Sequence, residues 1–312
     1  MPLPFHRWIQ YLPMPQQTIN DILDSIDKAS ENFLKTLPNI EKEQYKRIVQ
    51  LLKSLDTTAG NRIKSNIKNI NIINRIRTEL NDIVKSDPYI KAVKDFATVF
   101  DDISVLQNTY FSTISDKFTP SKTLEAVKQY YKKETVRMLL ETNTVEMGNN
   151  IAAVLRENIT GGGSYFDLTD VMKGLVQGTT EEASIGKRLF DKNVIDAVHQ
   201  YNRQYTKAVT DDLGLEWYQY VGSLLKTSRE FCVKMCKQRY FHKSEVPDIL
   251  KGQLANGVTV ALNPNNDLPK GMYDNEDENN FFIYAGGHKC GHGIFPVSTA
   301  SVPKAVRDRV GG

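Results

Sequence analysis

Apolar residues recur at spacings of three and four along the first half of the chain, which is the periodicity of amphipathic helices. The pattern begins at Thr18 and continues, with interruptions, as far as Ile159. Its clearest stripe has nearly heptad spacing and comprises Ile63, Ile67, Ile70, Ile73, Ile76, Leu80 and Ile83. Such an apolar seam has to be buried against another helix. We therefore predict a helical bundle, with packing inside one chain as the commoner arrangement and packing between chains as the alternative.

Prolines and glycines divide this helical region. Pro38 is expected to break the first helix, because proline lacks the backbone N–H group and its ring clashes with the preceding turn. Pro88 and Pro120 each stand where a new helix is expected to begin. The run Gly161-Gly162-Gly163 predicts a hinge. It is not a phosphate-binding P-loop, because no Lys-Ser or Lys-Thr pair follows it.

The pattern changes in the last third of the chain. A long helix is predicted over 193–213, and the aromatic and branched residues of 215–221 then indicate a strand. A second strand is predicted over 281–284, after a loop rich in Asn, Asp and Gly. The predicted fold class is α+β and predominantly α-helical. An elongated helical N-terminal region, residues 1–160, precedes a small α+β C-terminal domain, residues 164–312.

Composition limits the class of protein. Of the 312 residues, 40% are hydrophobic and 25% are charged, as in ordinary soluble proteins, and a net charge of +3 does not by itself indicate nucleic-acid binding. No stretch approaches the roughly 20 apolar residues of a membrane span, so we expect no membrane partner. Prolines in the first residues argue against a secretory signal, and the apolar side chains from Phe5 to Leu12 are expected to dock on another surface. An odd number of cysteines, three, favours a reducing compartment.

All three cysteines and two of the five histidines lie in two short segments near the end of the chain. On a helix, Cys232 and Cys236 stand one turn apart on one face. On an extended strand, His288, Cys290 and His292 all point the same way. Thiolates and imidazoles in closely spaced pairs are typical of structural zinc sites, which need four of these five groups. We predict a zinc site built from Cys232, Cys236 and Cys290 with either His288 or His292.

Two other interpretations of these residues remain open. The first is a disulfide between Cys290 and either Cys232 or Cys236, and the second is that the thiols are buried apolar groups. Catalysis is less well supported, because a thiol nucleophile needs an orienting partner and a metal nuclease needs further oxygen ligands. Three acidic residues stand near His288, in a loop expected to be solvated, and they are Asp274, Glu276 and Asp277. We find no convincing catalytic constellation and expect no enzyme activity.

Three short motifs in this region resemble the Mu F-like minor head proteins of tailed phages. They are Trp217-Tyr218-Gln219-Tyr220-Val221-Gly222-Ser223, Thr227-Ser228-Arg229-Glu230-Phe231-Cys232, and Gly286-Gly287-His288-Lys289-Cys290-Gly291-His292, followed by Pro296-Val297. The resemblance covers about 193–297. This chain departs from the family pattern in the third motif, where His292 stands in place of a common cysteine and no arginine follows Cys290.

The resemblance implies a phage minor head protein that acts in head morphogenesis without enzyme activity. Such a protein is made in the host cytoplasm and lies in the virion, in the capsid interior or near the portal. Its implied partners are the portal protein and other capsid proteins, and contact with packaged DNA and homo-oligomer formation stay open. The alternatives are a virion-carried metal-dependent nuclease or toxin-like effector, and a helical scaffold outside phages whose cluster only fastens a small domain.

Overall fold

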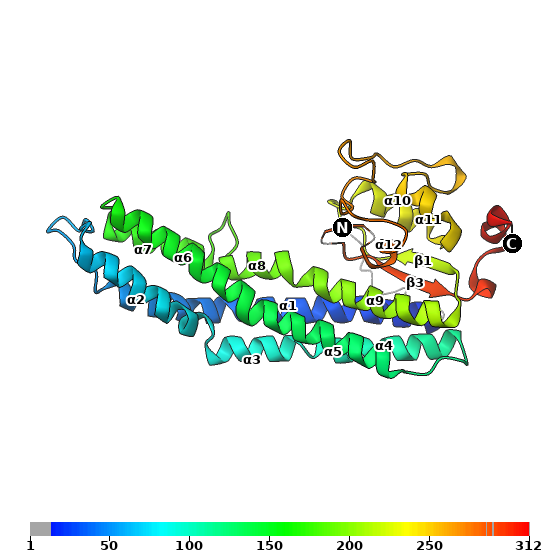
Figure 1. The fold of residues 1–312 in the computed structure, drawn as a ribbon, viewed down its shortest axis with the longest axis horizontal. Coiled ribbons are helices and arrows are strands. Elements are labelled where there is room, and N and C mark those ends of the chain that lie inside the picture. Colours follow the sequence, from blue (N-terminus) through cyan, green and yellow to red (C-terminus); the bar gives the residue numbers. More distant parts are fainter. Residues whose placement is uncertain (1–13, 285, 289, 312) are drawn as a thin grey trace, which may run out of the picture. The chain divides into compact units, whose positions relative to one another are not determined.

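The computed structural model describes residues 14–284, 286–288 and 290–311. These residues form many helices and one small sheet, which confirms the predicted α+β, predominantly helical fold class (Figure 1). The expected docking of Phe5 to Leu12 lies outside the described residues. The chain divides into two compact units that are not consecutive in sequence. Unit 1 contains the described residues up to Lys28 together with 99–132 and 196–311, and unit 2 contains 29–98 and 133–195. The predicted boundary between 160 and 164 stays a prediction.

Unit 2 is a helical bundle. Its first helix is the second half of α1, which begins in unit 1. The helices are α1 (Met14–Leu52), α2 (Ile67–Val84), α3 (Asp87–Phe96), α6 (Asn143–Thr160), α7 (Tyr165–Gln177) and α8 (Ile185–Asn193), with one π-helical turn at Met138–Thr142. Five of the seven residues of the predicted stripe, namely Ile63, Ile73, Ile76, Leu80 and Ile83, are buried here in one core with apolar residues of α1, α6, α7 and α8. The other two, Ile67 and Ile70 in the first turns of α2, are 78% and 43% exposed. Packing inside the chain is therefore confirmed.

Two predicted interruptions in this unit take a different form. Helix α1 continues through Pro38, whose ring lies on the exposed face while Leu37 and Ile40 are buried on the opposite one. Burial of these neighbours outweighs the missing backbone hydrogen bond, so the predicted break is wrong. The glycine run joins α6 to α7 within one unit, and Gly163 O accepts a hydrogen bond from Ile63 N at 2.8 Å. It is a hydrogen-bonded turn where a hinge was predicted.

Unit 1 places a small sheet and its short helices beside a pair of long helices. The helices are α4 (Val99–Ile114), α5 (Lys122–Arg137, which continues into unit 2), α9 (Ile195–Leu213), α10 (Glu230–Gln238), α11 (Val246–Leu250), α12 (Phe281–Tyr284) and α13 (Lys304–Arg307). The strands are β1 (Trp217–Val221), β2 (Tyr240–His242) and β3 (Gly293–Val297). The sheet is antiparallel in the order β2-β1-β3, with Tyr218 opposite Phe241 and Pro296.

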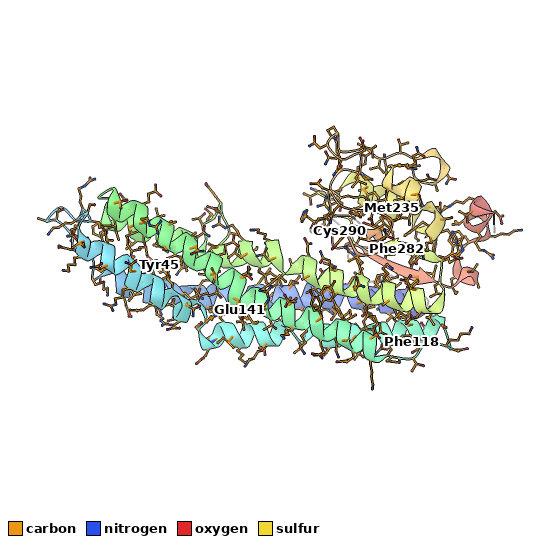
Figure 2. All side chains as sticks on the ribbon, in the orientation of Figure 1. Tyr45, Phe118, Glu141, Met235, Phe282 and Cys290 are labelled. Atoms are coloured by element: carbon orange, nitrogen blue, oxygen red, sulfur yellow. The ribbon has the colours of Figure 1, made fainter. Side chains whose placement is uncertain are left out.

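The sheet confirms one predicted strand and corrects another. The strand predicted over 215–221 is β1, whereas residues 281–284 form the short helix α12. Phe281 and Phe282 are buried against the sheet residues Tyr218 and Phe241, so tertiary packing decides their conformation. In Figure 2, Phe282, Met235 and Cys290 lie in the same C-terminal part of the unit, within one hydrophobic core.

Helices α4 and α9 pack together and position the sheet. Buried Gln107 of α4 donates to the backbone oxygen of Asn202 on α9 at 2.8 Å, and the rings of Phe100 and Tyr201 lie 5.1 Å apart. Tyr110 donates a hydrogen bond to Pro296 O on β3. The helix pair thus holds the strand that follows the predicted ligand segment. No helix in the described part of the chain has both the length and the apolar character needed to cross a bilayer.

Candidate metal centre

Helix α10 supplies two of the predicted ligands, and the segment before β3 supplies two more. Cys232 is 2% exposed and Cys236 stands one turn further along α10, half-buried. Cys290 and His292 are 3% and 6% exposed and immediately precede Gly293, the first residue of β3. Pairing of β1 with β3 brings this segment beside the start of α10, because α10 follows β1 in the chain.

Three of the ligand atoms lie at distances that fit a tetrahedral zinc ion. The sulfurs of Cys232 and Cys290 are 3.9 Å apart, and the Cys290 sulfur is 3.5 Å from Nδ1 of His292. Zinc–sulfur and zinc–nitrogen bonds of about 2.3 and 2.0–2.1 Å at tetrahedral angles require about 3.8 and about 3.5 Å. All three ligand atoms lie within 4.8 Å of one another. The donor set therefore fits a metal ion without rearrangement of the backbone.

A tetrahedral site needs a fourth ligand besides Cys232, Cys290 and His292. Cys236 is outside the group of three, but its thiol is close enough to His292 to raise the pKa of that imidazole. Cys236 is thus the nearest candidate for a fourth ligand on the protein. All three cysteines are free thiols, so neither disulfide pairing is present in the structure.

His288 is placed away from the other four residues. The predicted strand over the ligand segment is wrong, because Gly286 and Gly287 have positive φ angles of 85° and 71° and the backbone turns there. The His288 side chain is 70% exposed, its ring lies 4.0 Å from that of Tyr273, and Nδ1 is 3.7 Å from the Asp196 carboxylate. A strand would have aligned it with Cys290, whereas the glycine turn directs it to the surface.

The ionisation of the group without a metal ion is governed by hydrogen bonds between its members. The Cys232 thiol donates a hydrogen bond to the Cys290 sulfur. This bond, with the neighbouring His292 and Arg203, holds the pKa of Cys290 well below its usual value despite burial. The pKa of Cys232 is raised by the same hydrogen bond and by burial. Burial opposes protonation of His292, but Cys236 and Cys290 outweigh it and raise its pKa to about 9. Cys290 is therefore the thiol that loses its proton most readily, and metal binding would also displace the proton that His292 holds.

Tyr220 lies directly against the three ligands. Its hydroxyl is 3.5 Å from the sulfur of Cys232 and 3.4 Å from that of Cys290, and its ring stacks on His292 at 5.3 Å. Burial, and then the charge of Cys290, raises the pKa of Tyr220 well above its usual value, so the hydroxyl stays protonated and can donate to a thiolate. Groups that orient metal ligands in this way tune the ion that they hold.

Two arginines hold the ligand segment from opposite sides. Arg203 of α9 is buried and donates to the backbone oxygens of Cys290 and His292, each at 2.7 Å, and to Ile283 O at 3.1 Å. Arg229, the residue before α10, donates to the backbone oxygens of Gly286 and His288. Each arginine satisfies several carbonyl groups of an irregular segment, which fixes the ligand geometry before any ion binds.

Sequence reasoning named Arg229 and Tyr220 within the motifs but gave Tyr220 no role in the centre, and it did not single out Arg203. A signal for Arg203 exists, because it stands one turn from His199 beside the apolar stripe of α9, where a charged side chain is unusual. His199 itself is buried, burial lowers its pKa to about 3, and the group of three metal-binding atoms does not include it.

The acidic residues considered for a nuclease do not join the centre. Glu276 is buried and accepts a hydrogen bond from Tyr273 N, whereas the Asp274 carboxylate accepts one from Asn266 on the surface. Asp277 accepts hydrogen bonds from two backbone amides of its own loop. Among the described residues, only the group of Cys232, Cys290 and His292 brings three such ligand atoms together.

No protein-family model, no curated protein and no solved structure matches this chain.

Proposed function

We propose that this chain is a non-enzymatic phage minor head protein of the Mu F-like kind, in which a zinc ion closes the C-terminal unit. The observation that carries the zinc site is the buried group of Cys232, Cys290 and His292, whose ligand atoms have tetrahedral spacing. The motifs that contain these residues carry the phage assignment.

A structural role for the ion is supported by the burial of its ligands. The three side chains are 2%, 3% and 6% exposed, and a hydroxyl group of Tyr220 lies against both sulfurs. A catalytic zinc keeps a coordination position open to substrate, whereas a structural zinc is enclosed by protein ligands. In the proposed centre, zinc joins α10 to the segment before β3, and Cys236 completes four-coordination.

A binding role for the whole chain is supported by its architecture. The long helices supply extended surfaces for partners, and the sheet of unit 1 with its short helices and the candidate metal centre supplies a second surface. The proposed partners are the portal protein and other capsid proteins, at a position in the capsid interior or near the portal. Contact with packaged DNA and self-association are compatible with this role.

Elemental analysis of the purified protein tests the metal centre. The wild type is expected to hold about one zinc ion per chain, and Cys232→Ser and Cys290→Ser are expected to lose it. His288→Ala is the matched control, because this histidine lies outside the group and its loss should leave the zinc content unchanged. A wild-type protein free of zinc after purification with zinc present would refute the centre.

The phage assignment has a separate test. Mass spectrometry of intact particles, made by the phage or prophage that encodes this chain, is expected to detect it in few copies, and the purified portal protein is expected to retain it. Absence from the particles would exclude the assignment even if zinc is bound. DNA-cleavage assays with added divalent metal are expected to show no activity, and cleavage that His288→Ala or His292→Ala abolishes would favour the nuclease alternative.

A further inference from the structure

An apolar turn protrudes from unit 1 between β1 and α10. Its Leu224 and Leu225 are 48% and 70% exposed. Leu225 N donates to Ser228 Oγ at 2.8 Å, and Ser228 N donates to Leu225 O at 3.0 Å, so two hydrogen bonds close the turn. Single exposed leucines are common on protein surfaces, whereas here two adjacent leucines are exposed on one closed turn. We call residues 224–228 the leucine turn.

Both ends of the leucine turn are anchored at the candidate metal centre. Gly222 precedes it and lies so close to His292 that an added Cβ atom would be 2.6 Å from the imidazole Cδ2. Arg229 follows it and bonds to two carbonyls of the ligand segment. A turn fixed at both ends loses little conformational entropy when it binds, which favours association. Its Lys226 is exposed and has no ion-pair partner among the described residues.

A groove of matching character lies in the same unit. It has a volume of about 380 Å³ and is lined by α11 and the following loop, residues 253–259. Of its apolar lining residues, Val258 is 41% exposed, whereas Ile249 and Leu254 are buried, at 1% and 7%, and contribute little surface. Asp248 lies at the groove, is exposed, and has no ion-pair partner within the described ranges. We call this surface the acidic groove.

The leucine turn and the acidic groove belong to opposite ends of helix α10. Ser228 lies just before its first residue, Glu230, whereas Ala255 of the groove donates its backbone N–H to the side chain of Gln238, the last residue, at 2.9 Å. A helix of this length spans about 13 Å. The exposed leucines are not seated in the groove of their own chain. One surface therefore offers apolar groups with a free cation, and the other offers an apolar groove with a free carboxylate.

We propose that copies of this chain associate head to tail, with the leucine turn of one copy seated in the acidic groove of the next. In this contact Leu224 and Leu225 pack on Val258 and on the small exposed part of Leu254, and Lys226 pairs with Asp248. In such a contact, every open assembly has a free leucine turn at one end and a free acidic groove at the other. Further copies can therefore add at either end, or the two ends can meet and close a ring. The occupant is a second copy because the two surfaces complement each other in both apolar character and charge.

Sedimentation velocity over a range of protein concentrations tests the contact. The wild type is expected to form dimers and larger species as the concentration rises. Leu225→Asp should weaken the association about tenfold or more, because it removes a buried leucine and places a carboxylate beside Asp248. Lys226→Glu and Asp248→Lys should each weaken it, and the double variant should recover most of the loss. Lys237→Glu, an exposed lysine of α10 outside both surfaces, is the control and should leave it unchanged.

Mixing two defective variants distinguishes this contact from a symmetric one. Leu225→Asp keeps an intact groove and Asp248→Lys keeps an intact leucine turn, so an equimolar mixture should form a one-to-one dimer that grows no further. A wild type that stays monomeric at high micromolar concentration, a double variant no better than the single ones, or a mixture that stays monomeric would each overturn the proposal. Circular dichroism confirms that each variant is folded.

Discussion

At the scale of single residues, the candidate metal centre depends on glycines that let other groups approach closely. A Cβ atom added to Gly286 would lie 2.3 Å from the Cys290 sulfur and 2.8 Å from the Tyr220 hydroxyl, and the φ angle of this glycine is +85°. A side chain here meets both the sulfur and an unfavourable backbone conformation. Gly286 therefore has two roles: its positive φ angle forms the turn that directs His288 outward, and its lack of a side chain leaves room for the Cys290 sulfur.

Gly286→Ala is therefore expected to lower the free energy of unfolding by about 2–4 kcal/mol and to reduce zinc content. Gly214→Ala is the matched control, because Gly214 also has a positive φ angle, +63°, but its added Cβ would meet nothing within 4 Å. That variant should lose only about 1–2 kcal/mol from backbone strain. Chemical denaturation of both variants measures the difference, and equal losses would contradict the proposed close packing at Gly286.

Glu276 makes stability depend on pH. Burial raises its pKa to about 7 from the ordinary 4.5, although a backbone hydrogen bond from Tyr273 works in the opposite direction. The folded state holds the proton more tightly than the unfolded state. The stabilisation that comes from the tighter proton binding of Glu276 in the folded state is therefore fully present below about pH 4.5, and it is lost as the pH rises through about 7.

Glu276→Gln should remove this dependence, because glutamine keeps an oxygen for Tyr273 N and has no proton to lose. Between pH 4.5 and 7 the stability of the wild type should fall relative to that of the variant, by at most roughly 3 kcal/mol. Glu278→Gln changes an exposed neighbour and is the control. Unfolding free energies measured across this range would refute the assignment if the wild type and Glu276→Gln changed in parallel.

At the scale of elements, helix α1 shows that packing outweighs a local break signal. Pro38 cannot donate to the oxygen of Leu34, yet the helix continues because Phe33, Leu37 and Ile40 are buried in unit 2. The ring of Phe33 stacks on that of Phe190 at 4.5 Å, which holds the turn before the proline. Pro38 therefore lowers the stability of the helix, but the burial of its neighbours more than compensates.

Pro38→Ala should consequently stabilise the protein, by about 2 kcal/mol, because alanine restores the hydrogen bond and removes the clash with the preceding turn. Little packing is lost, since the proline is exposed. Asn39→Ala, at the next exposed position, is the control and should have a smaller effect. Thermal unfolding compares the two, and a destabilised Pro38→Ala variant would show that the proline has a packing role.

At the scale of the whole molecule, the metal centre and the helical bundle belong to different units. The three proposed ligands all lie in unit 1, whereas the core that contains the isoleucine stripe lies in unit 2. The ion would connect α10 to β3 across 58 residues of chain between Cys232 and Cys290. Removal of the ion is therefore expected to destabilise unit 1 before unit 2.

Chelation of zinc is expected to accelerate amide hydrogen exchange in β1, β3 and α10, while α2 and α6 keep their protection. The physical reason is that loss of the ion leaves a buried thiolate and an imidazole without their common partner. Cys290→Ser should reproduce the pattern in the absence of chelator, and Cys236→Ser should show a smaller change. Uniform acceleration in both units would contradict a centre that supports unit 1 alone.

Local patterns predicted most of the secondary structure and the residues of the centre. Periodicity identified the buried face of α2 apart from Ile67 and Ile70, and the branched and aromatic run identified β1, which is buried on both faces. The prediction failed where burial and backbone direction depend on distant residues. Phe281 and Phe282 read as a strand but form a helix against β1 and β2, and the short strand β2 had no distinct pattern of its own.

The sequence alone indicated that two segments could form one site, because they contain all three cysteines and two of the five histidines of the chain. Only the tertiary structure decided which of them meet. The turn at Gly286 and Gly287 directs His288 outward, while Arg203, from a helix about ninety residues earlier, holds Cys290 and His292 inward. The candidate ligands could thus be recognised from short segments of sequence, whereas their geometry depends on hydrogen bonds between distant parts of the chain.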